Sequence, residues 1–199
     1  PYTAKVISDY RMSSSHKHPK SSPRPVLHSP LPHTIDGENV NWFGKKHPCS
    51  TEYECECPKI SYNGRKYKNV EKAFQIQKAL YHGQEDMAQT MYYTLDTKYA
   101  TELGNSIDAS FEWNQVERVR IMKRLLYAKL ITCECYRNKM FHVRGVFRAK
   151  TSHSFWGGIT GKNVLGRLHH LVFNQHIDQL VDLFFPKDNI ITFHNKECY

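Results

Sequence analysis

The sequence predicts a mainly α-helical domain with a small N-terminal β-hairpin, and three observations lead to this fold class. Six segments repeat apolar residues at the spacing of amphipathic helices, and they are 69–82, 84–93, 97–104, 110–132, 134–141 and 162–184. Two short strand-like runs around Gly64, near 58–68, predict the hairpin. The 199 residues are enough for one domain with a sizeable core.

The first 40 residues differ in composition from the rest of the chain. Ser13 to His33 is rich in Ser, Pro, His and Lys and has little apolar periodicity. Such a segment buries too little apolar surface to offset its ordering entropy, so we expect residues 1–40 to form a disordered basic tail. The folded domain is expected over 41–185, followed by a C-terminal extension over 186–199.

Charge and cysteine content narrow the class of protein. The formal net charge of +9 suits phosphate-bearing ligands or nucleic acid, and the tail is a candidate for holding nucleic acid. There is no apolar run of about 18 residues, so no transmembrane helix and no membrane partner is expected. The six cysteines form a poor disulfide framework, which indicates free thiols and an intracellular protein, cytoplasmic or nuclear. A zinc site is an alternative, and its ligands would be Cys55, Cys57, Cys133 and Cys135.

The predicted helix 69–82 carries a narrow polar stripe. Asn69 is a good N-cap for this helix. Four polar side chains fall within about 60° of one another on its surface, and they are Glu71, Gln75, Lys78 and His82. A solvated face with a Glu–Lys pair is the simpler interpretation of this stripe.

The longest predicted helix, 110–132, combines basic and apolar residues. Its apolar stripe includes Trp113 and Val116. The surrounding cations are Arg118, Arg120, Lys123, Arg124 and Lys129. We expect most of these cations to lie on a solvated face and one or two to contact a ligand.

The segment Phe155–Gly166 places two aromatic residues and four glycines ahead of the helix predicted over 162–184. Val143 to Ala149, just before it, predicts a short strand. Closely spaced glycines are costly for folding, so they indicate positive φ angles or a close approach of the backbone to another group. Free N–H groups at a helix start suit a phosphate. A glycine-rich turn packed by two aromatic residues is the alternative.

Taken together, these motifs resemble the NADAR superfamily, also called the YbiA-like proteins. Its members carry a Glu-x-x-Phe-Gln-x-x-Lys helix after a hairpin, and residues 71–78 match this pattern. An Ala-x-x-x-Gly turn, a Trp opening a long basic helix and an aromatic-Trp-Gly…Gly-x-Asn-x-Leu-Gly loop follow in the family. The matching positions are Ala100 with Gly104, Trp113 and 155–166. Order and approximate spacing agree over roughly 42–175.

The resemblance implies a multihelical YbiA-like domain and an N-glycosidase without metal or cofactor. Family members are associated with ribosylamine-phosphate intermediates of riboflavin synthesis and with ADP-ribose attached to nucleobases. The implied ligand is therefore an ADP-ribose-like or ribose-phosphate small molecule. Cleavage of an N-glycosidic bond develops positive charge on the sugar, which a carboxylate stabilises.

Nine residues are expected to form the site. The catalytic set is Glu71, Lys78 and His153, in which Glu71 stabilises the sugar cation or activates water. Lys78 would bind phosphate, keep Glu71 ionised or attack C1, and His153 would act as acid or base. The expected substrate-binding residues are Gln75, Trp113, Trp156, Gly157, Gly161 and Asn163.

The chain also departs from the family pattern. Val70 replaces the usual Ser or Thr before the helix glutamate, and His153 stands where the family often has Asp. The glycine loop is shorter between Trp156 and Asn163. These departures favour an alternative function, a catalytically degenerate module that binds ADP-ribose or nucleic acid without cleaving it.

Overall fold

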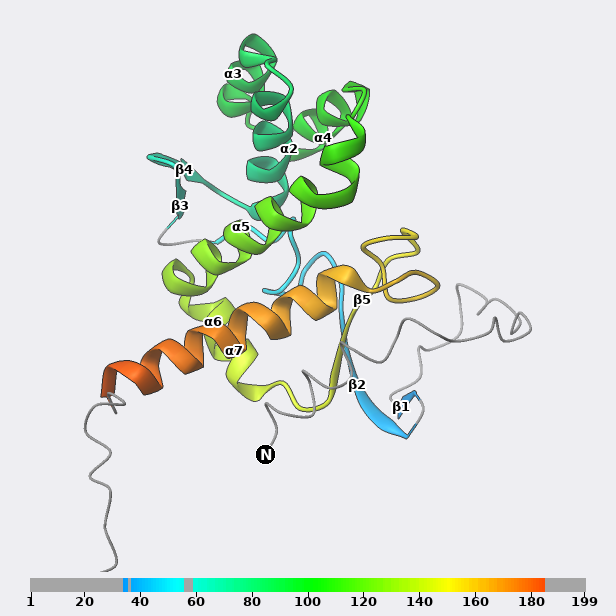
Figure 1. The fold of residues 1–199 in the computed structure, drawn as a ribbon, viewed down its shortest axis with the longest axis vertical. Helices are drawn as coiled ribbons and strands as arrows, with labels where there is room; N and C mark the ends of the chain where they lie inside the picture. The colour runs from blue at the N-terminus through cyan, green and yellow to red at the C-terminus, as the bar shows by residue number, and fades with distance from the viewer. Residues whose placement is uncertain (1–33, 36, 56–58, 185–199) are drawn as a thin grey trace, which may run out of the picture. The chain divides into compact units, whose positions relative to one another are not determined.

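Helices form most of the computed structural model, which describes residues 34–35, 37–55 and 59–184 (Figure 1). All six predicted helices are confirmed, and their bounds are α2 Val70–Tyr81, α3 Glu85–Tyr93, α4 Thr97–Ser106, α5 Arg118–Thr132, α6 Glu134–His142 and α7 Val164–Phe184. None of the helices in these ranges is long and apolar enough to cross a membrane. The predicted disorder before residue 34 and the predicted extension at 186–199 lie outside the described residues.

The strands form two small sheets. The predicted hairpin is present as β3 (Ile60–Tyr62) paired antiparallel with β4 (Arg65–Tyr67). The other sheet has the order β1-β2-β5, in which β5 (Val146–Ala149) is the strand predicted before the glycine loop. Its strand β2 (Glu38–Phe43) runs parallel to β5, with Val40 opposite Val146.

Two of these strands were not predicted, and they correct the N-terminal boundary. β1 (Thr34–Ile35) and the first half of β2 lie within the residues assigned to the tail, so the folded part of the chain includes Thr34. In β2 the buried residues are Val40 and Phe43, which do not follow the alternation of a half-buried strand. Its partner β5 lies about a hundred residues away, so no local signal marks the pairing.

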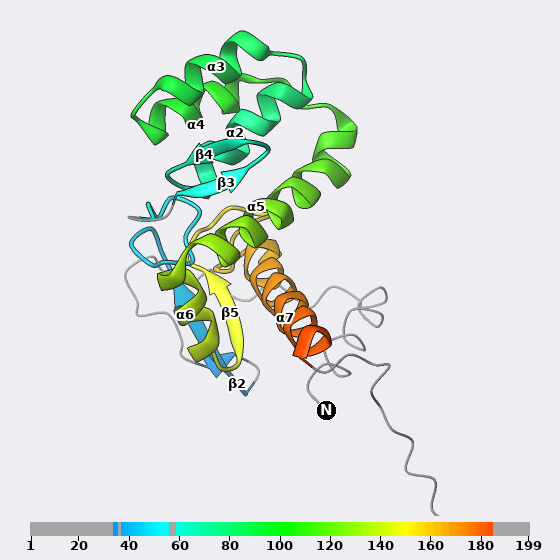
Figure 2. The same ribbon diagram turned by 90° about the vertical axis from the view of Figure 1, so that its left-hand side faces the viewer.

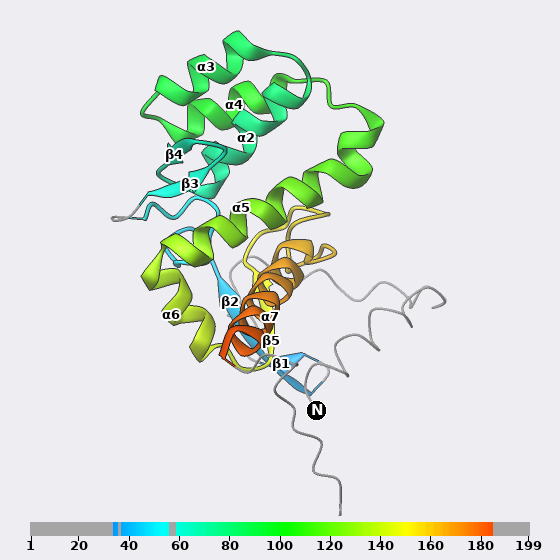
Figure 3. The same cartoon turned by 60° about the vertical axis from the view of Figure 1, so that its left-hand side comes forward.

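Helix α5 packs against elements on both of its sides. It contacts α2 and β3 on one side and α7 on the other, and α7 in turn packs on β5. Figures 2 and 3 show α2, α3 and α4 grouped on one side of α5, with α7, β2 and β5 on the other. The side chains of Leu125, Leu126 and Leu130 are fully buried, so α5 forms the centre of a continuous core.

A buried lysine ties α5 to the segment that precedes α2. Lys129 was predicted among solvated cations, but its side chain is fully buried. Its Nζ donates to Ser50 O at 2.8 Å and lies over the rings of Tyr53 and Tyr136. Burial lowers the pKa of this ammonium, and the next residue in the segment, Thr51, accepts a hydrogen bond from Glu71 N at 2.9 Å. Lys129 therefore helps to position the start of α2.

The predicted helix 110–132 contains a π-helical turn, η1 (Trp113–Glu117), directly before α5. Arg118 N–H donates to Trp113 O, which is the five-residue bond of a π turn. The extra residue in this turn shifts the helical phase. Val116, predicted on the buried stripe with Trp113, is consequently 47% exposed, whereas Trp113 is buried.

The loop between β5 and α7 is held by Asn163. Its Oδ1 accepts from Ala149 N at 3.2 Å, and its Nδ2 donates to Phe147 O at 2.8 Å, so one buried amide joins the helix start to the strand. The backbone of Asn163 has φ +53°, a left-handed conformation that Asn tolerates better than most residues.

Replacing Asn163 should therefore destabilise the fold. We expect Asn163→Ala to lower the free energy of unfolding by about 2–4 kcal/mol, because two buried backbone groups lose their partner and Ala is strained at positive φ. Asn163→Gly should cost about 1 kcal/mol less, because it removes the amide without the φ strain. Urea unfolding followed by circular dichroism measures both. Exposed Asn138→Ala serves as the control. An equal effect of the three changes would contradict the role of the Asn163 amide in joining α7 to β5.

Candidate functional site

A cleft of about 800 Å³ lies where α2, α4, η1 and the loops around residues 44–54 and 149–156 meet. This volume is within the range of small-molecule sites. Six of the nine predicted site residues line it, and they are Glu71, Gln75, Lys78, Trp113, His153 and Trp156. The structure thus brings together side chains that lie more than 80 positions apart in the sequence.

The first turns of α2 place a carboxylate and an amide in this cleft. Asn69 caps the helix by accepting from Lys72 N at 2.9 Å, which fixes where the polar stripe begins. Gln75 Nε2 donates to Glu71 Oε1 at 2.8 Å and so orients the half-buried carboxylate. A Cβ at Gly104 would collide with Gln75 Oε1, so this glycine allows α4 to lie against the Gln75 amide.

Lys78, two turns along α2, is held at the C-terminal end of α4. Its Nζ donates to Gly104 O at 2.8 Å and to Ile107 O at 3.2 Å. Burial lowers the pKa of the Lys78 ammonium, and the carboxylate of Asp108 partly opposes this shift. Lys78 is therefore easier to deprotonate than an exposed lysine while its amine stays fixed in the cleft.

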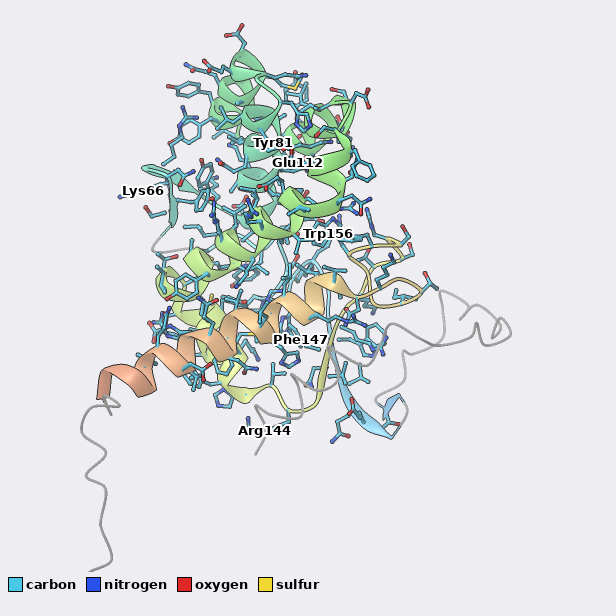
Figure 4. The ribbon with its side chains drawn as sticks, in the orientation of Figure 1. Lys66, Tyr81, Glu112, Arg144, Phe147 and Trp156 are labelled. Atoms are coloured by element: carbon cyan, nitrogen blue, oxygen red, sulfur yellow. The ribbon has the colours of Figure 1, made fainter. Side chains whose placement is uncertain are left out.

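Aromatic side chains form one wall of the cleft. Phe74 of α2 meets the Trp113 ring at 5.5 Å and the Trp156 ring edge-on at 5.9 Å, measured between ring centroids. Trp113 is only 2% exposed, so its main contacts are with the core. Trp156 is half-buried, lies on the loop before α7 (Figure 4) and lines the cleft, where its ring can contact a base or a ribose.

His153 has a defined place at the rim of the cleft. Its Nδ1 accepts hydrogen bonds from Phe155 N at 3.1 Å and Trp156 N at 3.2 Å, so this nitrogen carries a lone pair. In the neutral ring the proton then sits on Nε2, which is left to donate to a ligand. The imidazole thus caps the start of the glycine loop as an Asp side chain would, but without a negative charge.

The remaining three predicted residues do not line the cleft. Asn163 joins the start of α7 to β5, and both its amide oxygen and its amide nitrogen are hydrogen-bonded within the protein. A Cβ at Gly157 would collide with Thr151 O, and one at Gly161 with His153 O, so both glycines allow close packing inside the loop. The glycine pattern therefore reflects backbone approach within the loop.

Several of the backbone N–H groups expected to hold phosphate donate to carbonyls of the protein itself. Gly157 N donates to His153 O at 2.8 Å, Gly158 N to Ala149 O at 2.9 Å, and Asn163 N to Gly157 O at 2.7 Å. At the start of α7, Val164 N and Leu165 N donate to the carbonyls of Phe155 and Trp156. These N–H groups are used within the protein and are not free to hold a phosphate, so positive charge for a phosphate in the cleft must come from side chains.

Arg118 is the main site residue that the sequence analysis did not select. It was one of five cations on the predicted long helix, and no local signal distinguished it from the others. The structure places it in the wall of the cleft, with its guanidinium carbon 3.6 Å from the centre of the Phe155 ring. Only the π turn and the folding of the distant loop create this contact.

The described cysteines Cys49, Cys55, Cys133 and Cys135 lie near the buried ammonium of Lys129. Cys133 Sγ lies 3.1 Å from Cys135 Sγ, while Cys55 is buried and Cys57 lies outside the described residues. Within the described ranges, no three His, Cys, Asp or Glu side chains are arranged to hold a metal ion. The zinc alternative therefore depends on Cys57.

Comparison with known proteins agrees with this architecture. The solution NMR structure of the E. coli protein YbiA superposes with a TM-score of 0.59 at 21% identity, covering 79% of this chain and 93% of YbiA. At that identity the likeness shows the fold, which is YbiA-like. No curated protein gives a significant match. The sequence profile of the NADAR domain matches residues 33–172, which includes β1, β2 and every residue of the cleft, and the chain therefore belongs to the NADAR family.

Proposed function

We propose that this protein is an N-glycosidase that hydrolyses the N-ribosyl bond of an ADP-ribosylated nucleobase or of a ribosylamine phosphate. The observation that carries the proposal is the placement of Glu71, Gln75 and Lys78 beside Trp156 in one cleft. A carboxylate, an oriented amide, a half-buried amine and an aromatic side chain suit the cleavage of a ribosyl bond. A nucleobase within nucleic acid is compatible with the basic tail.

Glu71 is suited to the charge that develops during cleavage. As the bond to the base breaks, positive charge spreads over C1 and the ring oxygen of the sugar. One carboxylate oxygen of Glu71 is held by Gln75 Nε2, which leaves the other oxygen to stabilise that charge or to deprotonate water. Water then adds to C1, and the base leaves with a proton.

Lys78 is suited to act as an amine. Two carbonyls hold its Nζ, and burial favours the neutral form, which is the form that attacks C1. In that route the Nζ–C1 bond forms as the bond from C1 to the base breaks, and water later releases the sugar from the lysine.

His153 supports a second candidate function, a module that binds the same ligand without cleaving it. The imidazole keeps the loop capped through Nδ1 but supplies no carboxylate at the rim of the cleft. A family member that lost an acid here would retain the cleft and its aromatic wall while losing turnover.

An N-glycosidase and a binding module predict different effects of the change Glu71→Gln on turnover. If the protein is an N-glycosidase, this change should lower turnover by about 10²–10⁴-fold, the usual contribution of a catalytic acid or base. Affinity for ADP-ribose should stay within about threefold, because the new amide oxygen still accepts from Gln75 Nε2. Mass spectrometry of products from ADP-ribosylated guanosine DNA and from a ribosylamine-phosphate pyrimidine measures turnover, and calorimetry measures affinity.

Glu85→Gln is the matched control, because this glutamate is exposed on α3 and does not line the cleft. Equal turnover of the Glu71 variant and the wild type would refute the assigned role. Absence of turnover in the wild type, together with measurable ADP-ribose binding, would establish the binding module.

The role of Lys78 predicts a pH dependence. Because burial lowers its pKa, the neutral amine accumulates at lower pH than it would for a free lysine, and kcat should rise with pH to a plateau reached below the usual lysine range. Lys78→Arg should abolish this rise, whereas Lys66→Arg on β4 should leave the profile unchanged. When the sugar ring on Lys78 opens, the bond from C1 to the ring oxygen breaks and C1 and Nζ form an imine. Reduction of this imine with cyanoborohydride during turnover should attach the sugar to Lys78. A kcat that does not change on the alkaline side would exclude the amine as the nucleophile.

A further inference from the structure

The cleft needs a cationic partner if its ligand carries a phosphate. At the glycine loop and the start of α7, the amide N–H groups of Gly157, Gly158, Asn163, Val164 and Leu165 donate to carbonyls of the loop or of β5 and are not available to a phosphate. Lys78 is already engaged by two carbonyls of α4 and its C-cap. Three further lysines line the cleft: Lys45 pairs with Glu52, Lys98 pairs with Glu102, and Lys150 is exposed. Arg118 also lines the cleft, and its side chain is partly buried.

The π turn determines which side chain of the long helix enters the cleft. In a regular α-helix, residues five apart are rotated by about 140° from each other, so Arg118 would point away from Trp113. The bond from Arg118 N–H to Trp113 O instead closes a five-residue turn, which stacks Arg118 nearly under Trp113. Both side chains line the cleft as a result, followed one turn later by Met122.

The surroundings of Arg118 keep its guanidinium in place without neutralising it. The group lies over the Phe155 ring with its central carbon 3.6 Å from the ring centre, so the ring covers one face of the guanidinium. The neighbouring carboxylate of Glu117 pairs with Arg120 at 2.7 Å, and none of the ion pairs among the described residues includes Arg118. Its Nε is buried and finds no hydrogen-bond acceptor within the described ranges.

The Nη groups of Arg118 are in no hydrogen bond among the described residues, so they can donate to a ligand in the cleft. Ring stacking fixes the plane of the guanidinium, and the fork of N–H groups matches two oxygens of a phosphate. A lysine at this position would offer a mobile point charge without the stacking or the fork.

We propose that Arg118 is a specificity-determining residue that anchors a phosphate or pyrophosphate group of the ligand while Phe155 holds its guanidinium flat. This inference rests on the proposed function, since it takes the ligand to be a phosphate-bearing ribose derivative. It adds that the selection for phosphorylated over free nucleosides depends on one arginine that the π turn brings into the cleft.

Calorimetric titrations of the wild type, Arg118→Ala and Arg118→Lys test the proposal with three ligands: ADP-ribose, ribose 5-phosphate and adenosine. Arg118→Ala should weaken binding of each phosphate-bearing ligand by about 10- to 100-fold, the value of a hydrogen-bonded charge. Arg118→Lys should restore only part of the loss. The affinity for adenosine should not change in either variant.

Arg124→Ala is the matched control, because Arg124 lies on the same helix, is exposed and does not line the cleft. It should bind all three ligands as the wild type does, and thermal unfolding of every variant reports whether the fold is kept. If only ADP-ribose binding depends on Arg118, the anchored group is a pyrophosphate. If ribose 5-phosphate binding also depends on it, the anchored group is a single phosphate.

The proposal is overturned if the wild type binds no phosphate-bearing ligand, or if Arg118→Ala binds ADP-ribose and ribose 5-phosphate as tightly as Arg124→Ala. An equal loss of adenosine binding would also overturn it, because it would indicate a general distortion of the cleft. Failure of the proposed function is distinct from these results, since a protein without turnover would still show phosphate binding that depends on Arg118.

Discussion

Burial of helix α2 is the constraint on which the site depends. Val70, Ala73, Ile76 and Ala79 are fully buried, and α2 packs against α3, α4 and α5. Lys72 is locked on the α3 side, where its Nζ donates to Tyr92 O at 2.9 Å and to Thr94 O. The helix cannot rotate about its axis without breaking these contacts. The polar stripe from Glu71 to Lys78 is therefore fixed toward α4 and the cleft.

The same packing explains why the side chains of Gln75 and Lys78 lie so close to α4. Gly104 allows α4 to approach the Gln75 amide, and the carbonyls at the end of α4 then receive the Lys78 amine. On the other side, Lys129 holds Ser50, and the adjoining Thr51 carbonyl accepts from Glu71 N. Buried cations thus act here as structural links between segments, each satisfied by backbone carbonyls rather than by carboxylates.

The glycine loop and the long helix do not play the roles that their composition suggests, which are phosphate binding for the loop and a solvated basic face for the helix. Glycines at a helix start are typical of phosphate sites, yet the N–H groups of this loop donate to its own carbonyls and its glycines allow that close packing. Arg118, a cation of the cleft that takes part in none of the ion pairs among the described residues, rests on Phe155 from the same loop. The loop contributes aromatic surface and rigidity, and the helix contributes the charge. His153 is consistent with this division, since it secures the loop through Nδ1.

The sequence alone determined the features that depend on neighbouring residues. Local sequence patterns, including the Asn69 cap, located five helices within two residues of their observed ends, and the predicted start of the long helix at 110 lies three residues before η1 and eight before α5. The spacing of Glu71, Gln75 and Lys78 placed these three residues on one stripe. Those features follow from backbone geometry and local hydrogen bonds. Tertiary structure alone decided the parallel pairing of β2 with β5, the internal use of the Asn163 amide and the burial of Lys129. It also decided the entry of Arg118 into the cleft. Each of these depends on contacts between segments that are far apart in the chain, or on one additional residue in a helical turn, and neither leaves a periodic signal in the sequence.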